Sequence, residues 1–206
     1  MRDCIAAEGR IDLLAYWHAT DLYSEYYDSE GIIGGDSGLI TKDGIKKPSF
    51  YAFHFMSMLQ NHLLSKNDNM IITTNRNHAY RIVCHNSKKL TYRYAMKKEN
   101  EIQIAEQDSL FEDIDPIVLR LKITNVKNGN YLVKTNYVNQ GNGSVQNIWQ
   151  ELEYNKNLMA GEVDYLKRSA MPHVEMRMIR VENEVLEIES TLLAHEIRLT
   201  DIKYQY

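Results

Sequence analysis

The stretch IDLLAYWHATDLYSE, residues 11–25, decides the fold class of the first third of the chain. Its first part, Ile11 to Ala19, is a nearly continuous apolar run, which is typical of a strand buried on both faces of a sheet. A histidine, a threonine and acidic residues follow at once, as they do where a buried strand opens into a cleft. The stretch therefore predicts a buried strand that ends at a site.

The flanking residues predict that this strand belongs to an α/β unit. Residues 3–8 are expected to end a helix that Gly9 stops, and residues 20–47 to form a long loop of the kind that usually has a function. A second helix is predicted from Pro48 to Leu63, because apolar residues recur along it at helical spacing. One βα unit cannot bury its own strand, so residues 1–64 are predicted to be the end of a larger domain.

From residue 65 onward the hydrophobic period changes to that of antiparallel strands. Strands are predicted at 70–75, 78–86, 89–96, 101–107, 115–126, 130–139, 173–181, 185–191 and 195–204. Asn128-Gly129 predicts a hairpin between the strands 115–126 and 130–139. Two short helices are expected at 143–154 and 161–170. Residues 65–206 therefore predict a β-sandwich domain with a helical excursion at about 145–170.

The composition excludes several classes of protein. The 206 residues carry a formal net charge of −4, which argues against a nucleic-acid surface on this chain. No apolar run approaches the roughly 18 residues of a membrane span, and the start lacks a secretory signal. Cys4 and Cys84 are isolated, which predicts reduced structural thiols in a cytoplasmic protein. Histidines and cysteines do not fall at ligand spacing, so neither a metal nor a cofactor is expected.

Two segments of the first third resemble the end of the catalytic barrel in glycoside hydrolase family 39, the β-xylosidases. They are AYWHATDLYSE and GGDSGLITKDGIKKPSFYAFHFM. Three later segments are similar to that family's C-terminal β-sandwich, namely GSVQNIWQEL, GEVDYLKRSAMP and TLLAHEIRLTDI. The resemblance implies a mixed fold. Residues 1–64 would be the last strand, loop and helix of a TIM (β/α)8 barrel, and residues 65–206 an antiparallel β-sandwich domain.

The resemblance also implies where the catalytic residues lie. Family members use a retaining mechanism with two glutamates, one of them in an Asn-Glu-Pro motif on an earlier barrel strand. Asn-Glu-Pro does not occur in these 206 residues, and the family's nucleophile strand precedes the part that this chain resembles. The chain is therefore expected to contain no catalytic residue and to be inactive alone.

Four residues are predicted substrate contacts. Trp17 matches the strand-end tryptophan of the family and is either a floor for a sugar face or a core aromatic. His18 is either a hydrogen-bond donor to the sugar or an exposed loop residue. Asp21 matches an aspartate of the family, for which a loop-capping role is the simpler interpretation. Glu25 matches an acid that accepts hydrogen bonds from sugar hydroxyls, or it is a solvated loop acid.

The prediction for function is the C-terminal part of a retaining β-xylosidase-type hydrolase that acts on a xyloside or a related β-glycoside. The loop IIGGDS, residues 32–37, lacks the His and aromatics of the family's Phe-His-Gly-Gly-Phe, which leaves the sugar open. The alternative is the sugar-sensing C-terminal domain of an AraC-type transcriptional regulator with a family 39-like barrel. A truncated gene product is the third interpretation. Homo-oligomerisation of the full-length parent stays open.

Overall fold

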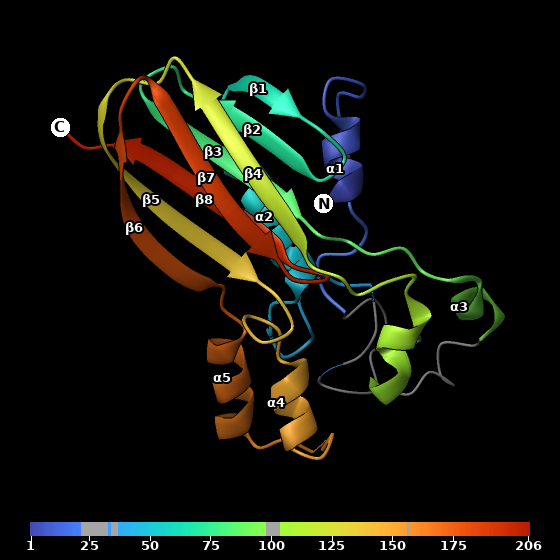
Figure 1. The fold of residues 1–206 in the computed structure, drawn as a ribbon. Coiled ribbons are helices and arrows are strands. Elements are labelled where there is room, and N and C mark those ends of the chain that lie inside the picture. Colours follow the sequence, from blue (N-terminus) through green and yellow to red (C-terminus); the bar gives the residue numbers. More distant parts are fainter. Residues whose placement is uncertain (22–32, 34–36, 98–103, 156) are drawn as a thin grey trace.

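Two antiparallel sheets form the centre of the protein, and helices cover one face of the larger sheet (Figure 1). The computed structural model describes residues 1–21, 33, 37–97, 104–155 and 157–206. The larger sheet has the strand order β1-β2-β3-β8-β5-β6, and β4 pairs with β7 in the smaller one. The strands are β1 (His62–Lys66), β2 (Met70–Thr74), β3 (Ala79–His85), β4 (Ile117–Thr124), β5 (Gly129–Val138), β6 (His173–Val181), β7 (Val185–Leu192) and β8 (Ile197–Tyr204).

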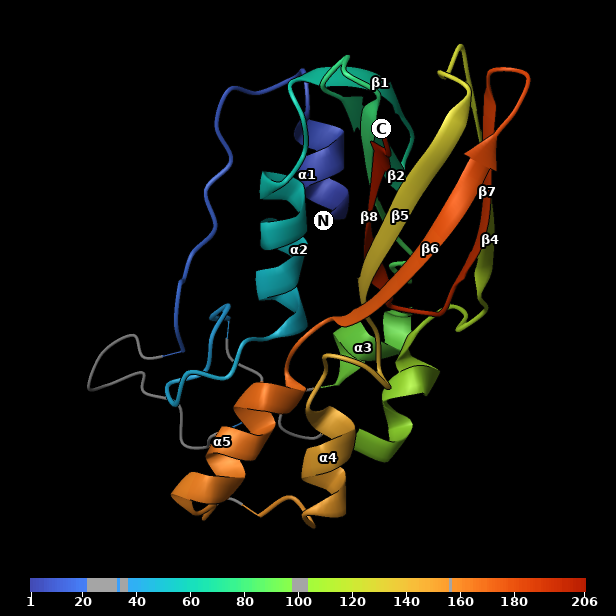
Figure 2. The same cartoon turned by 90° about the vertical axis from the view of Figure 1, so that its left-hand side faces the viewer.

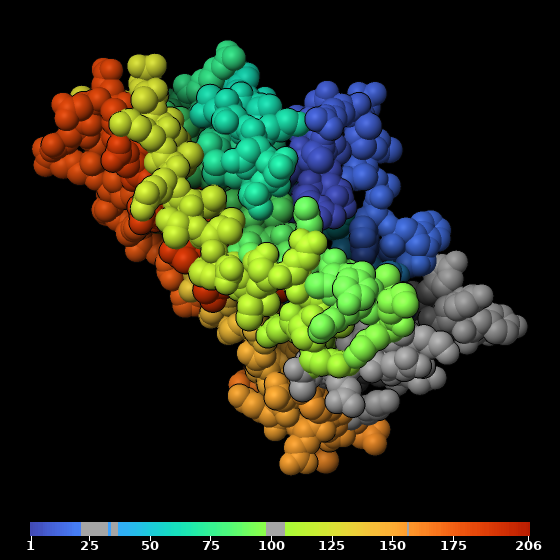
Figure 3. Space-filling model, turned by 45° about the vertical axis from the view of Figure 1, so that its right-hand side comes forward, coloured from blue at the N-terminus to red at the C-terminus, as the bar shows by residue number. Residues whose placement is uncertain are grey.

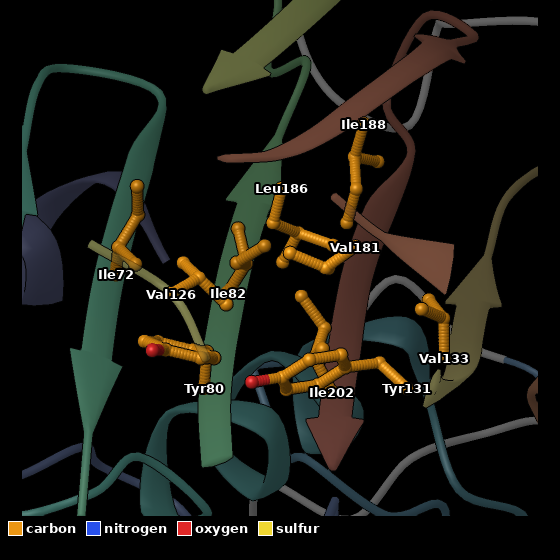
Figure 4. Packing of buried hydrophobic residues seen from close by; sticks show 10 residues of the cluster. All are labelled: Ile72, Tyr80, Ile82, Val126, Tyr131, Val133, Val181, Leu186, Ile188 and Ile202. Atoms are coloured by element: carbon orange, nitrogen blue, oxygen red, sulfur yellow. The ribbon is translucent and has the colours of Figure 1, made fainter. Parts of the chain in front are cut away.

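The main hydrophobic core lies between the two sheets. Alternate residues of each strand point into it, so Ile72 of β2 and Ile82 of β3 face the smaller sheet, while their neighbours Ile71 and Val83 face the helices. Figure 4 shows side chains from both sheets meeting in this layer, with Tyr131 fully buried. Each buried aliphatic side chain contributes on the order of 1.5–3 kcal/mol, so this layer supplies most of the stability.

Two helices cover the opposite face of the larger sheet (Figure 2). They are α1 (Arg2–Ala7) and α2 (Pro48–Ser57), and Ile5 and Phe55 bury against β2, β3 and β8. Pro48 occupies the first turn of α2, as predicted, because its missing N–H is not needed there. The helix ends earlier than predicted, at Ser57, and Leu63 lies in β1 instead. The predicted domain boundary after residue 64 falls inside β1.

A small helical lobe lies below the sheets. It contains α4 (Gln146–Glu151) and α5 (Ala160–Ser169), and Leu166 of α5 is buried against Ile45 of the loop that precedes α2. The 3-10 helix η2 (Ile104–Leu110) adjoins α4, since Gln146 donates a hydrogen bond to Gln107, and α3 (Tyr92–Met96) lies beside η2. The predicted helical excursion is therefore present at the expected place.

The predicted buried strand at Ile11–Ala19 is wrong for this chain. The segment is extended but forms no strand, and its apolar side chains are exposed, with Leu13 at 82% and Trp17 at 72% of full exposure. Figure 3 shows the blue N-terminal segment at the molecular surface. The apolar run matches a buried strand, but no described strand lies beside it to pair with it.

Three further predictions for the β-rich part are corrected. Residues 92–96 form α3 rather than a strand, since Tyr92 and Met96 find no sheet to pack on and stay exposed. The 101–107 segment lies partly outside the described residues, and its remainder belongs to η2. Asn128-Gly129 closes no hairpin, because β4 pairs with β7 along its whole length and β5 pairs with β6 and β8. The chain crosses between the sheets at this turn.

Candidate functional site

Two adjacent aromatic residues, the exposed Trp17 and the half-buried His18, lie at the end of the N-terminal segment. Their ring centroids lie 4.9 Å apart, with the planes tilted by 53°. The indole is mostly exposed, so one of its faces is open to a ligand. A sugar ring packs its C–H face on such a surface, because the aromatic ring offers a large apolar area at low entropic cost. Trp17 is not a core aromatic within the described residues, and its role as a sugar floor stays a prediction.

Tyr16 fixes the segment that carries this pair. Its hydroxyl donates a hydrogen bond of 2.6 Å to the carbonyl of Ser37, and its ring lies 5.2 Å from that of Phe53 in α2. Tyr16 therefore anchors the segment to the loop and the helix, whereas the neighbouring Trp17 is largely exposed. The sequence reasoning did not assign this role to Tyr16.

Asp21 is buried and holds the loop before α2. One carboxylate oxygen, Oδ1, accepts hydrogen bonds from the backbone N–H of Gly38 at 3.0 Å and from the Lys47 ammonium at 2.5 Å. Gly38 must approach this closely, since a Cβ there would lie 2.3 Å from the Asp21 nitrogen. The carboxylate links the N-terminal segment to the residue before α2. This arrangement favours the loop-capping interpretation of Asp21 over a sugar contact.

Glu25, the fourth predicted contact, lies outside the described residues. Its distance from Trp17 and His18 is therefore untested, and the four predicted contacts stay predictions as a set. The structure places the rings of Trp17 and His18 side by side and buries Asp21.

A hollow that the sequence did not predict lies between η2, the end of β5 and the β7–β8 turn. It has a volume of about 420 Å³ and is lined by Phe111, Asn139 and His195 among others. The His195 ring lies 4.2 Å from Phe111, and burial lowers the pKa of His195. Of the described residues that line it, Asp108 alone is a carboxylate, so the hollow lacks the pair that a retaining glycosidase requires.

A buried ionic network forms the structure beneath this hollow. Glu196, only 1% exposed, accepts hydrogen bonds at Oε2 from Asn139 at 3.0 Å and from the N–H of Leu193 at 3.4 Å. Its Oε1 accepts from two nitrogens of Arg198, Nε at 2.8 Å and Nη2. Four donors thus satisfy one carboxylate, which ties β5 and β8 to the turn that carries His195. The network is structural.

The Cys84 thiol is part of the buried core. Burial raises the pKa of Cys84 to about 12, so its thiol stays protonated and unreactive. Among the described residues, no three His, Cys, Asp or Glu side chains lie close enough to hold a metal ion. Within the same part of the chain, no helix is long and apolar enough to span a membrane.

Comparison with known proteins identifies the fold. No family model matches the chain. A β-xylosidase of Geobacillus stearothermophilus is 23% identical over 193 residues, which cover 94% of this chain and 34% of that protein. HTH-type transcriptional regulators of Staphylococcus aureus are 20% identical over 195 residues, covering 94% of this chain and 24% of theirs.

Solved structures give the same result. A monomeric β-xylosidase from Caulobacter crescentus CB15 has a TM-score of 0.75 at 16% identity and covers 98% of this chain and 40% of its own. The GH39 enzyme from Xanthomonas axonopodis pv. citri also has a TM-score of 0.75 at 16% identity, over 99% and 39% of the two chains. The predicted resemblance to the C-terminal portion of family 39 enzymes is confirmed. The chain spans between a third and two-fifths of the length of these β-xylosidases.

Proposed function

We propose that this chain is the C-terminal part of a retaining glycoside hydrolase of the β-xylosidase type. Residues 1–64 then complete a (β/α)8 barrel, and the two sheets brace it. Trp17, His18 and Glu25 line one wall of a site for a xyloside or related β-glycoside, and Asp21 holds that wall in place. Both catalytic glutamates belong to a preceding segment, so the 206 residues alone do not hydrolyse glycosides.

One observation carries this proposal. Residues 11–17 present large apolar side chains to solvent in an extended segment that Tyr16 anchors to Ser37 and Phe53. Contiguous apolar surface of this kind marks a place where another polypeptide packs. A neighbouring barrel strand on each side would bury this segment on both faces, which is the pattern of its sequence. The lengths of the β-xylosidase relatives leave room for such strands.

The test uses the open reading frame upstream of Met1. The proposal expects an in-frame segment with an Asn-Glu-Pro motif and a second strand-end glutamate. In that longer polypeptide, W17A should lower kcat/KM for an aryl β-xyloside about tenfold, the equivalent of about 1.4 kcal/mol of lost stacking. Y165A, which removes an exposed ring from α5, is the matched control and should change nothing. Equal effects of the two variants would remove the sugar-floor role of Trp17.

The second candidate is the sugar-sensing domain of an AraC-type regulator. The observation in its favour is that the staphylococcal regulators match the same 94% of the chain as the β-xylosidase does, although at lower identity. A basic segment with two helices of the helix-turn-helix kind upstream would support it. Where such a segment and both glutamates are present, hydrolysis of the aryl β-xyloside decides between cleavage and sensing. A cytoplasmic location fits either candidate.

A further inference from the structure

The two edges of the six-stranded sheet differ in how well they are protected. β1 at one edge has five residues and an irregular register between Leu63 and Ser65. Short, bulged edges of this kind prevent pairing with other chains. β6 at the other edge has nine residues and pairs with β5 without a register shift. In Figure 2 it is the strand nearest the viewer, and no described element covers its free side.

The side chains of β6 alternate between apolar and charged. Val174, Met176 and Met178 lie on the sheet face on which α1 and α2 pack, beyond the part that these helices cover, and are 44%, 63% and 56% exposed. Glu175 and Arg177 are on the opposite face and are also exposed. The Glu175 carboxylate accepts a hydrogen bond of 3.1 Å from the Tyr137 hydroxyl. Arg177 has no carboxylate within 4 Å among the described residues. A row of exposed apolar residues along an open edge predicts an interaction surface.

We propose that β6 pairs antiparallel with β6 of a second copy of this chain, centred on Met176. A twofold axis perpendicular to the sheet makes the contact self-complementary and continues each face of the sheet into the same face of the partner. Val174 then lies opposite Met178, and Glu175 lies opposite Arg177, each pair occurring twice. Each exposed apolar side chain gains an apolar cross-strand neighbour, and each unpaired guanidinium gains a carboxylate.

Charge selects this register over its neighbours. The twofold axis is perpendicular to the sheet, so two residues that lie opposite each other across the contact must belong to the same sheet face. This holds only when the axis passes at the level of a residue of β6, and not between two residues. Centring on Glu175 would place the two Glu175 carboxylates opposite each other, and centring on Arg177 would do the same for two guanidinium groups. Like charges directly opposite are destabilising in a sheet. Only the register centred on Met176 pairs opposite charges at these positions.

The contact should be reversible rather than obligate. Main-chain hydrogen bonds between two edge strands supply affinity, and the side-chain pairs supply specificity. One pair of strands buries less area than obligate dimers require, so the dimer should form in the micromolar range of concentration.

Sedimentation equilibrium of the 206-residue chain, from about 1 to about 200 μM, tests the proposal. The wild type should pass from monomer to dimer in this range. R177E or E175R places like charges opposite each other and should raise the dimer Kd at least about tenfold. The double variant E175R/R177E restores opposite charges and should return the Kd to within about threefold of wild type. Circular dichroism verifies that each variant is folded, as expected for exposed positions.

R120E on β4 is the matched control, since Arg120 is equally exposed but distant from the β6 edge. It should leave the Kd unchanged. A wild-type chain that stays monomeric at every concentration would overturn the proposal. So would a dimer that R177E does not weaken, a double variant as weak as the single ones, or a dimer that R120E weakens as much as R177E does.

Discussion

The buried carboxylate of Glu196 gives the sharpest stability prediction. E196Q keeps the shape of the side chain but removes its charge and turns one acceptor oxygen into a donor. The new NH2 group must replace either Oε1, which accepts from Arg198, or Oε2, which accepts from Asn139 and Leu193. All three partners are hydrogen-bond donors, so the NH2 group cannot bond to them. Hydrogen bonds to charged groups contribute about 1.5–3 kcal/mol each. Since at least one such bond is lost and the Arg198 charge stays buried, we expect a destabilisation of about 3 kcal/mol.

Urea unfolding and thermal unfolding both measure this loss. For a chain of this size the melting temperature should fall by about 6–12 °C. E189Q is the matched control, because Glu189 on β7 pairs with Arg120 in an exposed position and should cost less than about 0.5 kcal/mol. A loss below about 1 kcal/mol for E196Q, or equal losses for the two variants, would refute the reasoning from burial and donor count.

Three more predictions follow from individual side chains. Burial lowers the pKa of folded His85 to about 4, so the unfolded chain, with a pKa near 6.5, takes up the proton first. Stability should therefore fall by up to about 3 kcal/mol between about pH 6.5 and 4 and level off below, and H85N should flatten that part of the urea-unfolding profile. An unchanged slope would contradict this. G38A should displace the loop from Asp21 and speed amide exchange of Ile40 at least about tenfold, without a comparable drop in global stability. In W149F, the remaining Trp17 should be fully accessible to acrylamide, whereas a protected indole would argue against an exposed sugar floor.

Much of the fold could be predicted from local sequence patterns. Pro48 marks the start of α2, and Gly9 follows the end of α1. The alternation of apolar and polar residues at 173–204 predicted β6, β7 and β8, and in β7 it coincides with alternating burial. These features depend on residues close together in the chain, so the sequence alone is sufficient for them.

The errors come from tertiary pairing. The Asn128-Gly129 signal is strong locally, but the pairing of β4 with β7 outweighs it. The apolar run at residues 11–19 has the pattern of a buried strand, but no described strand pairs with it. Local periodicity cannot show which neighbour a segment will find.

The candidate site could be predicted only in part. Trp17 and His18 are adjacent in sequence, so their pairing needed no fold. Asp21 finds Gly38 and Lys47, which lie 17 and 26 residues further along the chain, and no spacing rule links them. The hollow at His195 combines three distant segments for the same reason. Contacts between distant segments require the folded structure.

Assay of the purified 206-residue chain on an aryl β-xyloside tests the central claim most directly. The account predicts that phenol release equals that of the buffer blank, because the chain supplies a wall of the site and no pair of catalytic carboxylates. Turnover at an enzyme-like rate, about 1 s⁻¹ or faster, that copurifies with the chain through several columns would contradict it.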